Sequence, residues 1–177
     1  MPAFEEVEAW LLEATAAVAS TYFQLPIAGQ PDAIYRERVY CYELYHQWRA
    51  RWREGFDYSL GGEVDKAGHP IIRGGSKPDF LVHRPGLMDN LLVVEVKPGN
   101  GEPNAMAEDL IKLCHFRGLP IDYRHAIFLL YGLPIEEWDA LQMRIARVLE
   151  GRDGFNPALV SILVHESAGT TAQKVDW

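Results

Sequence analysis

The sequence predicts an α/β protein with a mixed central β-sheet flanked by helices, folded as a single domain. Two helical patterns come first, three strand-like runs joined by short turns follow, and helix and strand then alternate. Strands joined by short turns pair antiparallel and strands joined through a helix pair parallel, so a mixed sheet is expected. At 177 residues and 48% hydrophobic composition, the chain can bury one core but is too short for two ordinary domains.

The first two elements are helices. Residues 3–24 carry apolar side chains near helical spacing and acidic side chains in the first turn, where the helix dipole stabilises them. Residues 25–31 contain two prolines and a glycine, which end this helix. Asp32 is a suitable N-cap for a second helix over residues 33–53. The many aromatic side chains of this second helix are expected to belong to the core rather than to a base-stacking surface.

Three strand-like runs follow the second helix. Residues 55–64 are weakly strand-like, with glycines that indicate a bend, and residues 65–68 have the composition of a hairpin turn. Residues 70–83 then contain the return strand, and residues 84–90 form a further turn. Residues 91–97 form an almost continuous apolar run, which is typical of a strand covered on both faces.

The rest of the chain alternates between helix and strand. Helical patterns cover residues 105–116 and 134–150, and apolar strands are predicted over 123–131 and 159–165. Residues 166–177 are small and polar until the end and are expected to form a loose tail. The predicted domain therefore has four parts: an N-terminal helix and linker (1–31), a core (33–132), a C-terminal helix and strand (133–165) and the tail (166–177).

Two charged side chains end the buried strand. Glu95 and Lys97 are two residues apart and share one face of the strand, so that Val94 and Val96 take the other. Burying a carboxylate and an ammonium group is costly unless they serve a function. Asp79 follows a proline at the head of the preceding strand, so neighbouring strand ends can bring Asp79, Glu95 and Lys97 together. The structural alternative is a simple ion pair between Glu95 and Lys97 at the sheet edge.

Pro78-Asp79, fifteen intervening residues and Glu95-Val96-Lys97 resemble the signature of the PD-(D/E)xK nuclease superfamily, which has the restriction-endonuclease-like fold. The superfamily core is a helix, a three-stranded meander, a helix and a further strand, which is the order predicted over residues 33–132. The resemblance implies a metal-dependent nuclease, a hydrolase of phosphodiester bonds, acting on DNA in restriction, repair or phage defence. It also implies Mg²⁺ as the cofactor, with Mn²⁺ as a substitute.

The resemblance assigns a role to each motif residue. Mg²⁺ prefers a few carboxylate oxygens and water molecules in octahedral geometry. Asp79 and Glu95 are therefore expected to hold the metal, together with the main-chain carbonyl of Val96. Lys97 is expected to orient the attacking water and to offset the negative charge that develops during cleavage.

The superfamily often adds a glutamate from its first core helix. Glu43 is the first candidate, because it is embedded among apolar and aromatic residues, although a helical-wheel count places it nearly opposite the apolar stripe. Glu37 on the same helix and Glu63 in the first strand are the other candidates. Lys112 occupies a position where the family often carries a polar or basic residue, but a solvated surface lysine is the expected reading.

The charge distribution favours a second functional hypothesis. The formal net charge is −8, and the first thirty residues contribute four acidic and no basic side chains. Residues 31–100 are balanced, with ten of each. Because nucleic-acid-binding proteins are usually basic, this acidity counts against a free-standing nuclease. It favours a catalytically inactive nuclease-fold module that acts as a binding or assembly subunit.

Other features bound the location and the partners of the protein. No apolar run is long enough to span a membrane, and acidic residues occupy the N-terminal region where a signal peptide would be basic, so a cytoplasmic protein is expected. Cys41, Cys114 and six scattered histidines show no zinc-binding spacing. Because no helix-turn-helix or zinc finger is visible, a protein partner is expected to supply specificity. The choice between DNA and RNA, endo- and exonuclease, and monomer and dimer stays open.

Overall fold

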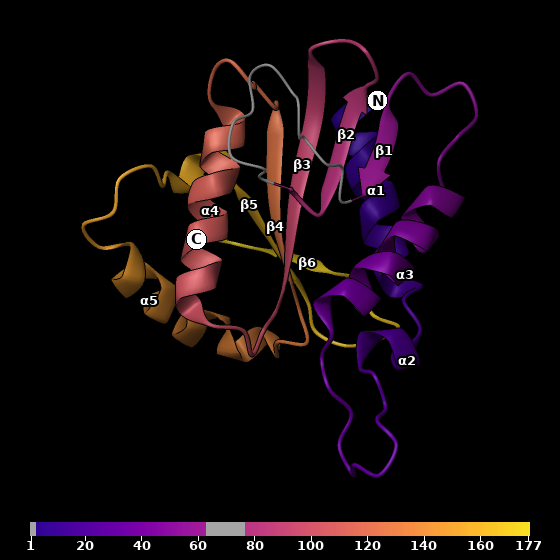
Figure 1. Ribbon diagram of the computed structural model, residues 1–177, viewed down its shortest axis with the longest axis vertical. Helices are drawn as coiled ribbons and strands as arrows, with labels where there is room; N and C mark the ends of the chain where they lie inside the picture. The colour runs from indigo at the N-terminus through magenta and orange to yellow at the C-terminus, as the bar shows by residue number, and fades with distance from the viewer. Residues whose placement is uncertain (1–2, 63–76) are drawn as a thin grey trace.

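The computed structural model describes residues 3–62 and 77–177 as one mixed sheet with helices on both faces (Figure 1). Within these residues, β1 to β3 pair antiparallel, β3 to β5 pair parallel, and β6 is antiparallel to β5. The predicted α/β class and mixed sheet are confirmed. The strands lie side by side in the order of the sequence: β1 (Ser59–Gly62), β2 (Phe80–Arg84), β3 (Asp89–Pro98), β4 (His125–Tyr131), β5 (Ser161–His165) and β6 (Gln173–Val175).

The helices form a layer on each face of the sheet (Figure 1). Buried residues of α1 to α3 pack together with one face, and those of α4 and α5 with the other. In the described part of the chain, none of the helices combines the length and apolar character that a bilayer crossing requires. The α-helices are α1 (Ala3–Ala16), α2 (Ser20–Phe23), α3 (Glu37–Ala50), α4 (Pro103–Arg117) and α5 (Trp138–Leu149), with short 3-10 turns at Ile135–Glu137 and Pro157–Leu159.

The two N-terminal helices are shorter than the sequence predicts. The helix predicted over residues 3–24 is two helices in the structure: α1 ends at Ala16, and the short α2 covers Ser20–Phe23. The second helix begins at Glu37 rather than at residue 33, because Leu25 and Ile34 exchange two backbone hydrogen bonds of 2.8 and 3.0 Å. This pairing holds the residues before α3 in an extended conformation.

Aromatic side chains of α3 form part of the core, as predicted. Tyr40 is fully buried and stacks on Tyr131 of β4 with ring centroids 4.0 Å apart. Trp48 is also fully buried and meets Phe80 of β2 edge-on at 5.9 Å. Tyr42 is the exception in this helix, since it is 61% exposed.

The central strand β3 is covered on both faces, as predicted for residues 91–97. Residues 91–96 are at most 2% exposed. Val94 and Val96 pack with the α1–α3 layer, whereas Val93 packs with the α4–α5 layer. The carboxyl end of β3, which carries Glu95 and Lys97, is therefore enclosed between the two helical layers.

The predicted loose tail is wrong for most of its length. Residues 173–175 form β6, the edge strand that pairs with β5. The indole Nε1 of Trp138 donates a 2.9 Å hydrogen bond to the carbonyl of Asp176, and Trp177 packs edge-on against Phe155. These apolar and backbone contacts offset the entropy cost of ordering a polar segment.

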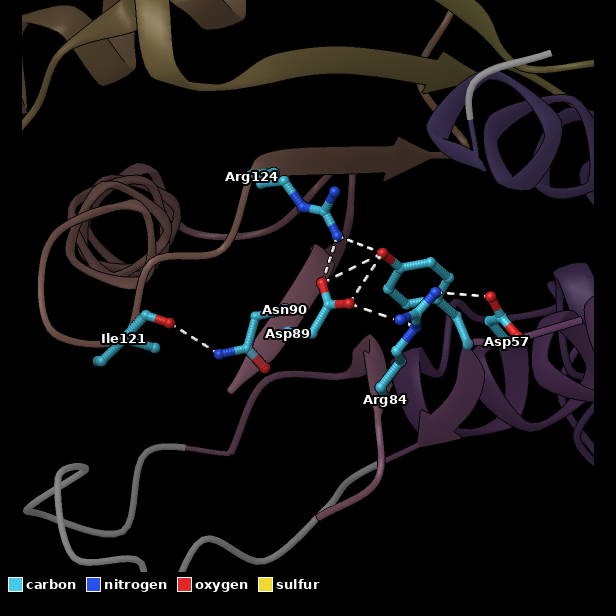
Figure 2. A network of polar contacts seen from close by, with 7 residues as sticks. Asp57, Arg84, Asp89, Asn90, Ile121 and Arg124 are labelled. Atoms are coloured by element: carbon cyan, nitrogen blue, oxygen red, sulfur yellow. Dashed lines mark hydrogen bonds and ion pairs between the residues drawn. The ribbon is translucent and has the colours of Figure 1, made fainter. Parts of the chain in front are cut away.

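A polar network lies at the end of the sheet where β3 begins (Figure 2). It connects residues of β2 and β3 with residues immediately before β1 and β4. The carboxylate of Asp89 accepts a hydrogen bond from the Tyr58 hydroxyl at 3.1 Å, pairs with Arg84 Nε at 3.3 Å and contacts the guanidinium of Arg124. Arg84 also pairs with Asp57 at 2.6 Å. Asp89 is therefore the common acceptor that connects these strands.

Replacing Asp89 with alanine is expected to lower the free energy of unfolding by about 1.5–3 kcal/mol, the range for hydrogen bonds to a charged group. Asp57→Ala is the matched control, since the Asp57 side chain is 71% exposed. A pair this exposed is worth about 0–1 kcal/mol. Urea denaturation of both variants checks the prediction, and equal losses would contradict it.

Candidate functional site

The candidate site lies where β2 begins and β3 ends. Phe80 pairs with Val94, and the same register places Asp79 opposite Glu95. The Asp79 carboxylate is fixed by a 2.7 Å hydrogen bond from the backbone N–H of Val96. The two acids predicted from the motif are therefore neighbours, and the charge of Asp79 acts on the Glu95 carboxyl.

Lys97 lies between the two helical layers. Its ammonium group is 2.9 Å from a carboxylate oxygen of Glu37 in α3 and 3.2 Å from one of Asp109 in α4. The predicted alternative, a simple ion pair between Glu95 and Lys97, is not observed, because each residue has other partners. Lys97 instead joins α3 and α4 across the end of the sheet.

Lys112 of α4 belongs to the site, although a solvated surface lysine was expected from the sequence. Its ammonium group is 2.5 Å from Glu95, whose side chain is 3% exposed, and 3.5 Å from Asp109. The expectation of a solvated lysine is therefore wrong. Asp109 and Lys112 are three residues apart and share one face of the helix, and this spacing is the signal that points to them.

Glu37, and not the first-ranked Glu43, is the glutamate of α3 that contacts Lys97. The carboxylate of Glu43 contacts His46 at 3.3 Å and Gln47 at 2.8 Å on its own helix. Glu37, in the first turn of α3, reaches Lys97. The geometry thus favours Glu37 over Glu43, in agreement with the helical-wheel count, while Glu63 and the predicted turn at 65–68 lie outside the described residues.

Burial and mutual repulsion perturb the titration of the site. Burial is the main cause that raises the pKa of Asp79 from 3.8 to about 6. The hydrogen bond from Val96 lowers this pKa, and the negative charge of Glu37 raises it further. Burial and the charge of Asp79 also raise the pKa of Glu95 well above its usual value, although Lys112 opposes this. Burial disfavours the charged form of Lys97, but Asp109 and Glu37 together raise the pKa of its ammonium group.

The charges of the site are not balanced. Four carboxylates (Asp79, Glu95, Glu37 and Asp109) share two ammonium groups, those of Lys97 and Lys112. Counted over these six described side chains alone, the fully ionised cluster carries two negative charges in excess, and Glu95 within it is only 3% exposed. A single divalent cation would neutralise this excess.

The donor atoms fit Mg²⁺. Asp79 and Glu95 supply hard carboxylate oxygens, the type that Mg²⁺ prefers. The N–H of Val96 points to Asp79, and in an antiparallel ladder the N–H and C=O of one residue face the same neighbour. β2 begins only at Phe80, and Pro78 before it has no N–H to donate to β3.

These donors do not form a closed metal cage. Among residues 3–62 and 77–177, no group of three or more histidine, cysteine, aspartate and glutamate side chains is arranged to hold a metal ion. Mg²⁺ commonly binds through one or two carboxylates and keeps several water molecules, so two carboxylates and a carbonyl meet its needs. Neither a protein-family model nor a curated protein matches this chain, and the resemblance to PD-(D/E)xK nucleases stays a hypothesis.

Proposed function

We propose that the protein is a Mg²⁺-dependent nuclease with a restriction-endonuclease-like core, acting on DNA. The observation that carries the proposal is the convergence of buried Glu95, half-buried Asp79 and Lys97 at the ends of adjacent strands. The elevated pKa values of Asp79 and Glu95 support it, because burial and nearby negative charge disfavour their ionised forms, and a bound cation would favour those forms.

Each residue has a role that its position supports. Asp79, Glu95 and the Val96 carbonyl would hold the metal ion. When bound, Mg²⁺ supplies a water of lowered pKa and neutralises charge on the phosphate. Lys97 is kept protonated by Glu37 and Asp109, so it serves as a fixed positive charge rather than as a general base. It would orient the attacking water and stabilise negative charge on the phosphoryl oxygens.

A second candidate function is a catalytically inactive module of the same fold that serves as an assembly subunit. The ion pair between Lys112 and Glu95 favours it, because a lysine already compensates the acid without a metal. The net charge of −8 also disfavours binding to polyanions.

The discriminating experiment combines a calorimetric Mg²⁺ titration with a cleavage assay on single-stranded and duplex DNA and RNA. The wild type is expected to bind Mg²⁺ and to cleave in Mg²⁺ or Mn²⁺ but not in EDTA. Lys97→Ala is expected to remove cleavage, and Lys174→Ala, at an exposed lysine of β6, is the matched control. Circular dichroism establishes that each variant is folded.

Two outcomes separate the candidate functions. Equal cleavage by the wild type and Lys97→Ala would discard the nuclease proposal. A protein that binds no Mg²⁺ and cleaves no substrate would support the assembly module.

A further inference from the structure

A pocket of about 300 Å³ opens directly beside Asp79, between α3 and the strands β1 and β2. Asp79 thus borders both the candidate metal site and this pocket. The other surfaces of the pocket are mainly apolar. Its lining residues are Cys41, Tyr42, Tyr45, Gly62, Asp79 and Phe80.

The walls of the pocket are aromatic rings. Tyr42 is 61% exposed, so its ring is not part of the core. The rings of Tyr45 and Phe80 are nearly parallel, at 12°, with centroids 6.5 Å apart. Burial raises the pKa of the Cys41 thiol, which therefore stays neutral and contributes an apolar surface.

Gly62 lies on the strand side of the pocket, directly against the ring of Tyr45. A Cβ atom at this position would lie 3.3 Å from the ring of Tyr45, which is tighter than an ordinary contact. Any larger side chain would therefore crowd the space beside Tyr45. The absence of a side chain at Gly62 therefore allows the Tyr45 ring to lie close against β1 and to form this wall of the pocket.

We propose that this pocket binds an unpaired nucleobase next to the phosphate that is cleaved, so that the substrate is single-stranded nucleic acid or an unpaired strand end. The inference rests on the proposed nuclease function. Aromatic side chains stack on bases of any sequence, and Tyr42 is the ring accessible for this contact. A base within a duplex is paired and stacked on its neighbours, so it must be unpaired to enter a side pocket.

The position of Asp79 connects the pocket to the chemistry. A residue that holds the metal ion and lines the pocket places a bound base one nucleotide unit from the reacting phosphate.

Binding is measured without cleavage, in EDTA, with a short single-stranded DNA that carries the fluorescent base 2-aminopurine. Stacking on Tyr42 is expected to quench its fluorescence. Tyr42→Ala is expected to weaken binding on the order of tenfold, whereas Tyr42→Phe keeps the ring and binds like the wild type. Tyr22→Ala is the matched control, because Tyr22 is 46% exposed but does not line the pocket.

Cleavage in Mg²⁺ supplies the second measurement. The wild type is expected to cut single strands faster than blunt duplex of the same sequence, and Tyr42→Ala is expected to lose most of that preference. Quenching that depends on Tyr42 without cleavage would support the base pocket and reject the nuclease proposal. Cleavage without any effect of Tyr42→Ala on quenching or on strand preference would overturn the base pocket alone.

Discussion

Asp79→Asn is expected to stabilise the protein while it removes the proposed metal-dependent cleavage. Burial raises the pKa of Asp79 from 3.8 to about 6, so the charged form at neutral pH is disfavoured in the folded state. Such a difference corresponds to about 2–3 kcal/mol of free energy of unfolding at neutral pH. Asparagine keeps an acceptor for the N–H of Val96 and carries no charge.

The gain in stability should depend on pH in a defined direction. The folded state binds a proton at Asp79 more tightly than the unfolded chain does, because the folded pKa is the higher one. This contribution is fully present below about pH 4 and is lost as the pH rises through about 6. The stability curves of the wild type and Asp79→Asn should therefore converge in acid and separate towards neutral pH.

Mg²⁺ should reduce the difference in stability between the two proteins. A ligand that binds only the folded state raises stability with its concentration, so Mg²⁺ should stabilise the wild type more than Asp79→Asn. Urea denaturation across pH, with EDTA or with Mg²⁺, measures both effects. If Asp79→Asn is less stable than the wild type at neutral pH, the ionised Asp79 carboxylate stabilises the fold. The prediction that its charge destabilises the folded state would then be wrong.

The fold was predictable wherever local pattern and tertiary contact agree. The continuous apolar run of β3 and the breakers after it determine a buried strand and a loop without knowledge of the rest of the chain. Local pattern fails where a distant segment decides the conformation. Gln173 and Lys174 are polar, yet the strand Gln173–Val175 pairs with β5, and the backbone N–H of Ala172 donates to Thr15 in α1.

The sequence predicted the strand residues of the candidate site, but not all of its helical residues. Alternation along β3 places Glu95 and Lys97 correctly, because a strand has only two faces. A helix offers many directions, and α4 has to be docked on the sheet before Lys112 can be seen to reach Glu95. For the same reason, the neighbours of Glu43 in the sequence do not reveal whether Glu43 or Glu37 reaches Lys97, since residues adjacent in a helix point in different directions.

Lys112→Met is expected to lower the free energy of unfolding by about 3 kcal/mol at neutral pH in EDTA, the lower end of the range for breaking a buried ion pair from one side. Lys112 is 2.5 Å from Glu95, whose side chain is 3% exposed. Without the ammonium group, the carboxylate keeps its desolvation penalty and the repulsion of Asp79. Methionine retains the length and apolar stem of the lysine, so the change tests charge rather than packing.

The double variant Glu95→Gln/Lys112→Met isolates this interaction. It is expected to recover most of the loss in stability, because the acid that needed compensation is gone, whereas additive effects of the two changes would contradict the pairing.

The affinity for Mg²⁺ supplies the second comparison. Lys112 and a cation would compete for the same carboxylate of Glu95, so Lys112→Met should bind Mg²⁺ more tightly than the wild type. Unchanged Mg²⁺ affinity in this variant would mean that Glu95 is no metal ligand and that Lys112 is its permanent counter-charge.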